Sequence, residues 1–106
     1  MSLKWPPKDP DEKLDYSVDW SRFLGEDTIS SVSWFINDAD GVKTTAQAVT
    51  TVNGLTFEGN SNSNTVALAV FSGGTNNTFY DVTCRITFGT SQLTSERKIK
   101  LPIRGQ

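Results

Sequence analysis

The sequence predicts an all-β protein, namely an immunoglobulin-like antiparallel β-sandwich of about seven strands with an extended N-terminal arm. Three observations lead to this fold class. Apolar and polar residues alternate with period two along much of the chain, and the longest example is Thr78–Phe88. Turns rich in Gly, Asn, Asp and Ser separate the alternating segments. No window shows a sustained helical period. A small β-barrel is the alternative topology.

Size and composition limit the possible functions. The chain has 106 residues, which suits one domain, and its formal net charge of −2 indicates no partner by sign. Lys and Arg are scattered, so we expect no nucleic-acid partner. The chain contains no histidine, which excludes Ser-His and Cys-His nucleophile pairs and removes the commonest metal ligand. We therefore expect no enzyme activity, no metal site and no cofactor.

The single cysteine, Cys84, lies on the apolar parity of its strand. We expect a buried core thiol, because free cysteine is among the most buried residue types. An intrachain disulfide is impossible, so packing must supply the stability, which is compatible with a reducing compartment. The sequence has no run of about 18 apolar residues, so we expect no transmembrane helix and no membrane partner. We also expect no signal peptide.

An extended arm is expected at the N-terminus. Three prolines within five positions, beginning with Pro6 and Pro7, fix φ and remove backbone donors. We therefore divide the chain into an arm, residues 1–11, and a single sandwich domain, residues 12–104. Trp5 either folds back onto the domain surface or anchors a neighbouring subunit, since Trp is common at binding hot spots.

The first strand is predicted at Glu12–Trp20, where the apolar residues occupy alternate positions. The alternation breaks at Ser21–Asp27, which contains Gly25. We expect a tight helical turn in that segment, with Phe23 or Leu24 directed inward.

The next strand is predicted at Thr28–Ile36. Val32 and Trp34 share one face, and Trp34 is the candidate for the central core aromatic. Ile29 and Phe35 count to the opposite face. Apolar residues on both faces indicate a strand that is covered on both sides or that lies near a partner.

The middle of the chain is rich in turn signals. Asn37–Gly41 predicts a hairpin turn, and a calcium loop is the weaker alternative because the ligand spacing fails. Val42–Val52 is rich in Thr, Val and Ala and predicts one edge strand with a bulge. Asn53-Gly54 predicts a two-residue hairpin turn, after which Leu55 opens a short strand.

A polar loop is predicted at Gly59–Asn64. The following segment, Thr65–Phe71, predicts a strand whose two faces are both apolar. We assign Val66, Leu68 and Val70 to the core face.

The two longest alternating segments come last. Thr78–Phe88 is predicted as the central strand, and Leu93–Ile103 as the last one. Lys98 and Lys100 face outward on this last strand, where lysine discourages edge-to-edge pairing. Residues 104–106 are expected to form a free tail. The predicted core comprises Tyr16, Val18, Trp20, Val32, Trp34, Ile36, Leu55, Phe57, Val66, Leu68, Val70, Tyr80, Val82, Cys84, Ile86, Ile99 and Leu101.

Several segments in order resemble the small structural proteins of tailed phages and prophages. In that group an arm like Lys8–Glu12 precedes a strand like Leu14–Trp20, and a segment like Leu24–Ile29 follows. The far end is also similar, from Gly73–Thr75 to the last strand with Ser95–Arg97. The resemblance spans most of the chain.

This resemblance implies a non-enzymatic virion component, such as a fibre–tail adaptor or a neck-region protein, that is assembled in the bacterial cytoplasm. The family supplies no catalytic residues. The implied partners are other virion subunits or further copies of the chain. The candidate partner-binding residues are Trp5, Pro6, Pro7, Ile29 and Phe35. On this hypothesis, deletion of residues 1–10 leaves the fold intact but reduces assembly.

The alternative function is an accessory module that binds carbohydrate or another surface ligand. Immunoglobulin-like sandwiches often bind ligands through loops at one end. Two polar segments, Asn60–Asn64 and Gly73–Asn77, are the candidate loops. Neither contains the aromatic residues on which sugars stack.

Overall fold

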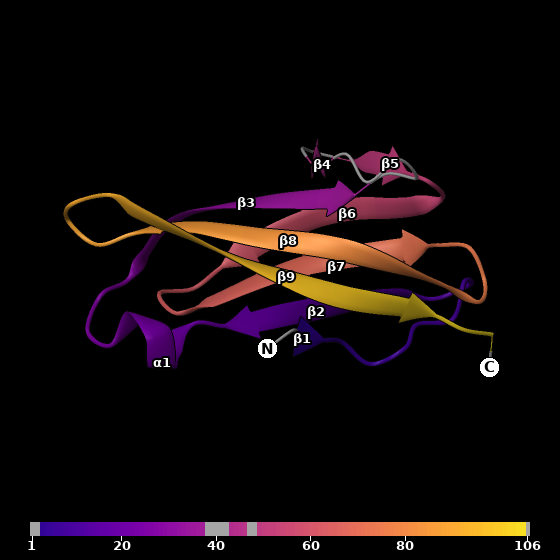
Figure 1. Ribbon diagram of the computed structural model, residues 1–106, viewed down its shortest axis with the longest axis horizontal. Helices are drawn as coiled ribbons and strands as arrows, with labels where there is room; N and C mark the ends of the chain where they lie inside the picture. The colour runs from indigo at the N-terminus through magenta and orange to yellow at the C-terminus, as the bar shows by residue number, and fades with distance from the viewer. Residues whose placement is uncertain (1–2, 38–42, 47–48, 106) are drawn as a thin grey trace.

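The computed structural model describes residues 3–37, 43–46 and 49–105. Within these residues two sheets pack face to face as a β-sandwich, which confirms the predicted fold class (Figure 1). One sheet has the strand order β1-β9-β8-β3-β4, and the other has the order β2-β7-β6-β5. The elements are β1 (Leu3–Lys4), β2 (Lys13–Asp19), α1 (Ser21–Leu24), β3 (Ile29–Asn37), β4 (Lys43–Ala46), β5 (Thr50–Val52), β6 (Leu55–Asn62), β7 (Val66–Gly73), β8 (Thr78–Phe88) and β9 (Leu93–Ile103).

The two longest strands, β8 and β9, have the bounds that the alternation predicts. They pair antiparallel from Thr78 opposite Ile103 to Phe88 opposite Leu93. β8 lies between β9 and β3, so it is a central strand as expected. Its apolar parity faces the second sheet and is buried, including Cys84. The alternation therefore determines both the strand and its inner face.

Two features of immunoglobulin-like domains organise the core. Trp34 is fully buried on β3, as predicted. Tyr80 begins the buried parity of β8, and its hydroxyl donates to the Asn53 carbonyl at 2.7 Å. The same hydroxyl accepts a hydrogen bond from the Thr75 backbone N–H at 2.9 Å. Tyr80 therefore ties the β5–β6 turn to the β7–β8 loop at one end of the sandwich.

The predicted orientation of β7 is wrong. Ala67, Ala69 and Phe71 are fully buried, whereas Val66, Leu68 and Val70 face outward and are half-buried. The reason lies in the register with β2, because Ala69 is opposite the inward-facing ring of Tyr16. A small residue leaves room for the ring. Both parities of this strand are apolar, so alternation alone could not identify the inner face.

The segment predicted as one edge strand, Val42–Val52, instead connects the two sheets. β4 pairs with β3 in the first sheet, and β5 pairs with β6 in the second. The Asn53-Gly54 turn is confirmed, with φ angles of 51° and 91° at these two residues. Residues 38–42, which include most of the predicted Asn37–Gly41 turn, lie outside the described residues. The flanking strands β3 and β4 pair antiparallel.

The prediction of a loop at Gly59–Asn64 is wrong for residues 59–62 and correct for Ser63 and Asn64, which lie between β6 and β7. β6 continues to Asn62 and pairs with β7, after a register shift between Phe57 and Gly59. The shift is a β-bulge, which adds a residue to one strand and lets pairing continue beyond it. The polar composition of the end of β6 therefore gave no indication of a strand, because the exposed side chains of a strand need not be apolar.

Both chain ends join the first sheet. β1 pairs parallel with β9, and Lys8 forms a further parallel bridge with Ile103. The Arg104 N–H donates to the Lys8 carbonyl at 2.8 Å, and the Gly105 N–H donates to Asn76 Oδ1 at 2.7 Å. The expectation of a free tail is therefore wrong for residues 104 and 105. The division between arm and domain at residue 11 stays a prediction.

Candidate interaction surfaces

The structure places Trp5 in the core. Its side chain is 8% exposed, and its ring stacks on Tyr16 with centroids 4.8 Å apart. The Trp34 and Phe71 rings lie 6.1 and 5.8 Å away. Trp5 Nε1 donates to the Ser17 carbonyl at 3.1 Å. Trp5 thus closes the side of the sandwich between β1 and β2, and a partner cannot reach its ring while the arm is docked.

The next part of the arm is a compact turn built on a buried lysine. Lys8 is fully buried, and its ammonium donates to the carbonyls of Asp9 and Gly73, both at 2.8 Å. Burial lowers the pKa of Lys8, and the nearby carboxylates of Glu12, Asp9 and Asp11 oppose this effect. The Asp9 N–H donates to Glu12 Oε1 at 2.9 Å, and the Asp11 N–H donates to Asp9 Oδ1 at 2.8 Å. The Lys8–Glu12 motif therefore has a structural role.

Ile29 also belongs to the core. The register between β3 and β8 shifts between Ile29 and Ser31, which marks a β-bulge. The extra residue changes the parity, so Ile29 turns inward and joins the core cluster, at 8% exposure. Counting by two along the sequence had assigned it to the same face as Phe35. Without the pairing pattern of β8, the sequence carries no signal for this bulge.

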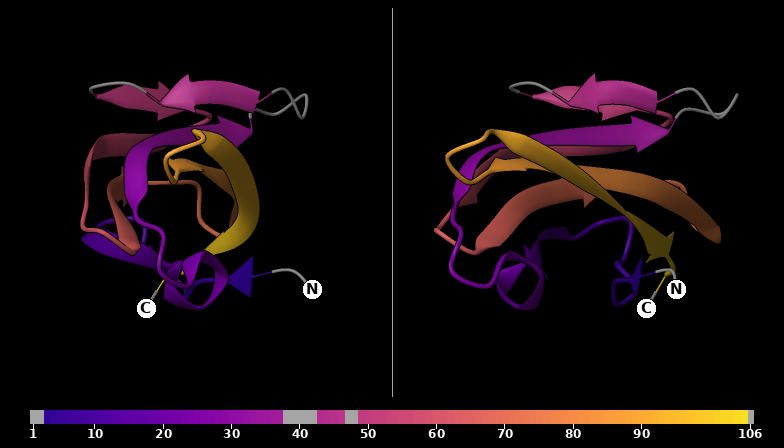
Figure 2. Two further views of the ribbon diagram at one scale, coloured as in Figure 1. Left: turned by 90° about the vertical axis from the view of Figure 1, so that its left-hand side faces the viewer. Right: turned by 60° about the vertical axis from the view of Figure 1, so that its left-hand side comes forward.

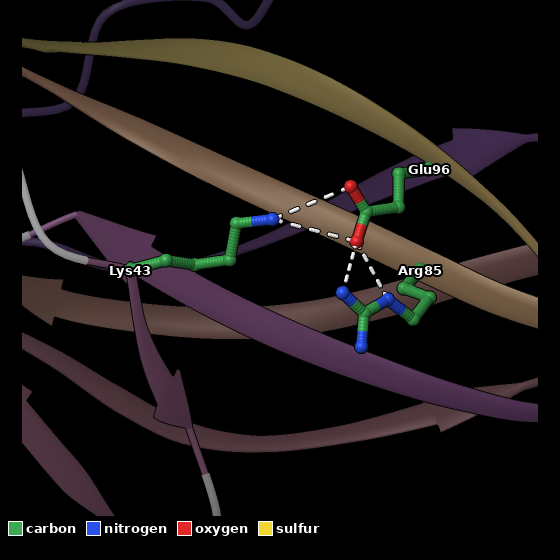
Figure 3. Close-up of polar contacts among 3 residues, drawn as sticks. All are labelled: Lys43, Arg85 and Glu96. Atoms are coloured by element: carbon green, nitrogen blue, oxygen red, sulfur yellow. Dashed lines mark hydrogen bonds and ion pairs between the residues drawn. The ribbon is translucent and has the colours of Figure 1, made fainter.

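Phe35 does face outward from the sandwich, but its own chain covers it. The side chain is 8% exposed, with the Arg85 guanidinium 4.6 Å and the Lys43 ammonium 5.3 Å from the ring centroid. Glu96 joins the two cations, as Figure 3 shows. Its carboxylate accepts a hydrogen bond of 2.6 Å from Arg85 Nε and lies 3.3 Å from Lys43 Nζ. We call these four residues the Phe35 surface.

A single carboxylate, that of Glu96, pairs with both cations of the Phe35 surface. The hydrogen bond from Arg85 is the largest influence on Glu96, and together with Lys43 it lowers the pKa of that carboxyl group. All three charged side chains remain more than a third exposed. The long stems of Lys43 and Arg85 lie over the ring while their charges stay in water. The ring of Phe35 is therefore already covered by the chain itself, and both cations above it are paired with an acid of the chain.

Pro6 and Pro7 are exposed, so they are the candidate residues that stay accessible. The Pro6 carbonyl accepts a long hydrogen bond of 3.4 Å from the Tyr16 hydroxyl. Among the five candidates, the structure thus brings Trp5 and Ile29 into the core, covers Phe35, and leaves the two prolines on the surface. Partner binding by any of them stays a prediction.

Within the described residues, four large hydrophobic side chains are exposed, namely Phe23, Val49, Phe79 and Leu93. Phe79 is an apolar residue on the polar parity of β8, and the sequence predicted no function for it. Phe23 was expected only as a core residue. The core residue of that helical turn is Leu24, which is buried.

Phe23 lies at the end of the sandwich that carries α1 and the β8–β9 turn, the end facing the viewer in the left panel of Figure 2. Its ring is 48% exposed and packs edge-on against Trp20 and Phe88, with centroids 5.6 and 5.4 Å apart. Leu93, 55% exposed, is opposite Phe88 in the register of β8 and β9. The Arg97 guanidinium lies 4.3 Å from the Trp20 ring centroid. This end of the sandwich therefore exposes the apolar side chains of Phe23 and Leu93, with the cationic Arg97 nearby.

Phe79 lies near the opposite end, at the start of β8. Its side chain is 55% exposed, and Lys100 Nζ sits 4.2 Å from the ring centroid. Pro102 is directly opposite in the register of β8 and β9, and Lys4 is opposite Lys100 in that of β1 and β9. These residues and Arg104 line one shallow hollow of about 80 Å³. We call Lys4, Phe79, Lys100, Pro102 and Arg104 the Phe79 surface.

The described residues offer little for chemistry. They contain no group of three or more His, Cys, Asp and Glu side chains placed to hold a metal ion. Burial raises the pKa of the Cys84 thiol to about 12, although the Trp20 indole and Arg97 oppose this shift. A thiol with so high a pKa is a poor nucleophile. In the same part of the chain, no helix is long and apolar enough to cross a membrane.

The fold and the surfaces define a class of protein, a small β-sandwich module whose notable features are exposed aromatic surfaces at its two ends. A sequence profile places it more closely. The chain belongs to the family described as the podophage GP4 fiber-tail adaptor protein gp77, whose profile matches residues 8–102. The match confirms the resemblance to phage structural proteins that the sequence motifs indicated. The chain is thus a phage structural protein. No curated protein matches it.

Proposed function

We propose that this chain acts without catalysis, as an adaptor in the tail that joins neighbouring virion subunits through protein–protein contacts. The observation that carries the proposal is the family match, which begins at Lys8 and extends over residues 8–102. The match includes both ends of the sandwich and the turn built on Lys8. The implied location is the virion, after assembly in the cytoplasm of the bacterial host.

The shape of the molecule supports a joining role. Its extents are 42 × 26 × 24 Å, so it is markedly longer in one direction. The two segments that carry exposed aromatic side chains, α1 with Phe23 and the start of β8 with Phe79, lie towards opposite ends of the molecule (Figure 1). An adaptor must contact at least two neighbours, and separated contact surfaces let it do so without competition. Aromatic residues and Arg are also enriched at the energetic centres of protein interfaces.

The accessible candidates for contact are therefore the rings of Phe23 and Phe79, with Pro6 and Pro7 on the arm. Trp5 and Ile29 contribute indirectly, because their burial fixes the arm and the start of β3. This assignment revises the reason for choosing the sequence candidates but keeps the two prolines. It also predicts that the arm works as a docked element of the sheet, since its backbone is paired with β9.

The experiment that tests the function is quantitative mass spectrometry of purified particles from the phage that encodes the chain. We expect the chain at a fixed copy number per particle. Deleting its gene should give particles that lack fibres, and supplying the wild-type chain should restore them. Fibre-bearing, infectious particles formed without the chain would overturn the proposal.

A further inference from the structure

We propose that the Phe79 surface binds an acidic, extended segment of another virion protein. The inference rests on the proposed function and names the chemistry of one partner. It begins with the arrangement of three cations on the outer face of the first sheet. Lys4 and Lys100 are neighbours across β1 and β9, and Arg104 follows two residues after Pro102. The three cationic residues line the same hollow.

Among the described residues, none of these three cationic side chains forms an ion pair of 4.0 Å or less, and Asp81, the acid opposite Lys100 in the register of β8 and β9, is paired with Lys98. Elsewhere on this face the cations are paired, since Glu96 binds both Lys43 and Arg85, and Lys98 lies 4.0 Å from Asp81. The chain as a whole carries a net charge of −2, so a cluster of unpaired cations does not follow from composition. Like charges placed directly opposite each other across two strands are destabilising. A bound anion would relieve that repulsion.

The hollow has room for a small anionic group beside an apolar one. Its volume is about 80 Å³, and Phe79 and Pro102 contribute apolar atoms to its wall. One water molecule needs about 10–15 Å³ of such space, so the hollow has room for a carboxylate group. Lysine ammonium and arginine guanidinium groups both bind carboxylates by charge-assisted hydrogen bonds. The half-exposed ring of Phe79 offers contact to an apolar residue beside the acid.

A nucleic acid would need a different surface. Proteins that bind single strands combine a basic groove with aromatic side chains on which successive bases stack. Here the ring of Phe79 is already contacted by Lys100, at 4.2 Å, and the hollow holds no second aromatic side chain among the described residues. The positive charge of the hollow and its single aromatic side chain among the described residues therefore favour acidic side chains of a protein segment.

The test uses the full chain and a defined probe, a fluorescein-labelled peptide of sequence Gly-Glu-Glu-Leu-Asp-Glu-Gly, measured by fluorescence anisotropy at low salt. We expect saturable binding that weakens as salt rises, because the contacts are ionic. The triple variant Lys4→Glu, Lys100→Glu, Arg104→Glu should weaken binding at least tenfold. The control variant Lys13→Glu changes an exposed lysine on β2, in the other sheet, and should bind like the wild type.

Four results would overturn the inference. They are equal binding by the triple variant, equal weakening by Lys13→Glu, tighter binding of a single-stranded oligonucleotide than of the peptide, and self-association of the wild-type chain that the triple variant abolishes. Circular dichroism establishes that each variant is folded, and the single variant Lys100→Glu repeats the test with a smaller change. Particle analysis separates this inference from the proposed function. Particles with normal copy number and fibres but carrying the triple variant would refute the inference alone.

Discussion

The Phe35 surface and the Phe79 surface both place a cation over a phenylalanine ring, but only the Phe35 surface includes a carboxylate. Each has a phenylalanine on the outer face of the first sheet with a cation over its ring, at 4.6 Å for Arg85 and 4.2 Å for Lys100. Phe35 is 8% exposed, whereas Phe79 is 55% exposed. The carboxylate of Glu96 holds two cations over Phe35, whereas no carboxylate of the described residues lies within 4.0 Å of the Lys100 ammonium over Phe79.

The comparison shows why one region of a β-sheet face is covered by its own chain while another stays accessible to a partner. Where an acid in the chain binds the cations, their stems cover the ring and the surface is complete. Where the cations have no acid, the ring stays exposed and the charges repel, so a partner can supply what is missing. Stability and binding are therefore expected to separate between the two surfaces, which the following variants test in order of decreasing effect.

The largest effect is expected for Trp5→Ala, which removes the side chain that holds β1 and so disrupts the Phe79 surface from behind. Truncation of a buried aromatic residue costs about 3–5 kcal/mol. Trp5 is 8% exposed and packs on Tyr16. We expect urea unfolding to show a loss of this size. The matched control is Pro7→Ala on the exposed arm, which should change the free energy of unfolding by about 0.5 kcal/mol or less. A wild-type unfolding curve for Trp5→Ala would show that the arm is not docked.

The same reasoning revises the deletion experiment. The sequence suggested that removing residues 1–10 leaves the fold intact, because a proline-containing arm was expected to lie outside the sheet. The structure buries both Trp5 and Lys8 in that segment. We now expect the deletion to destabilise the fold, so lost assembly would not isolate a binding role for the arm. Point changes at Pro6 and Pro7 are the better test of binding.

A second comparison pairs Phe35→Ala with Phe79→Ala. Phe35→Ala removes a buried ring and should lower the free energy of unfolding by about 1–3 kcal/mol. The loss stays in this range because one side of the ring is covered by the cationic side chains of Lys43 and Arg85. The second removes a ring that is more than half exposed and should change it by about 0.5 kcal/mol or less. Thermal unfolding of the two variants in one buffer gives the difference directly. Equal losses would remove the distinction between a closed and an open surface.

The sequence predicted the fold correctly in some strands and wrongly in others, and the difference has a physical cause. The alternation in β8 and β9 predicted both strands and their inner face, because apolar residues are concentrated on one parity and polar residues on the other. Where both parities were apolar, as in β7, or a bulge intervened, as before Ser31, counting by two assigned the wrong face. Those errors concern Val66, Leu68 and Val70 on the one hand and Ile29 on the other.

The interaction surfaces were less predictable, for a physical reason. The Phe79 surface combines residues from β1, the start of β8 and the end of β9, which the parallel pairing of β1 and β9 brings together. The sequence predicted an arm but no pairing for it, so Lys4 had no neighbours. The Phe35 surface likewise depends on Glu96, 53 residues from Lys43. Contacts between distant segments have no local signature in the sequence. The family motifs therefore indicated the class of protein but not which residues meet on its surface.

The third test opens the closed surface. Glu96→Gln keeps the shape of the side chain but removes its charge, and exposed ion pairs contribute about 0.2–1 kcal/mol. We expect a loss of that order at pH 7. Because the pKa of Glu96 is lowered in the folded protein, its contribution is present above the ordinary value of 4.5 and is lost as the pH falls through the folded value. The unfolding curves of wild type and variant should therefore converge as the pH falls below the lowered pKa of Glu96. A constant difference down to pH 2 would mean that Glu96 contributes by packing.

The smallest effect is expected at the open surface, and it has the opposite sign. Lys100→Gln removes one of two lysines that lie opposite each other across β1 and β9, without deleting the stem that packs near Phe79. Relief of like-charge repulsion should raise the free energy of unfolding by about 0.2–0.5 kcal/mol at low salt. Salt screens exposed charges, so the gain should disappear at about 1 M NaCl. Arg85→Gln is the matched change at the Phe35 surface, where the cation is paired with Glu96, and it should lower stability at low salt. If Lys100→Gln also lowered stability, an acid within the chain would already be paired with Lys100. The Phe79 surface would then offer no unpaired lysine charge at this position to a partner.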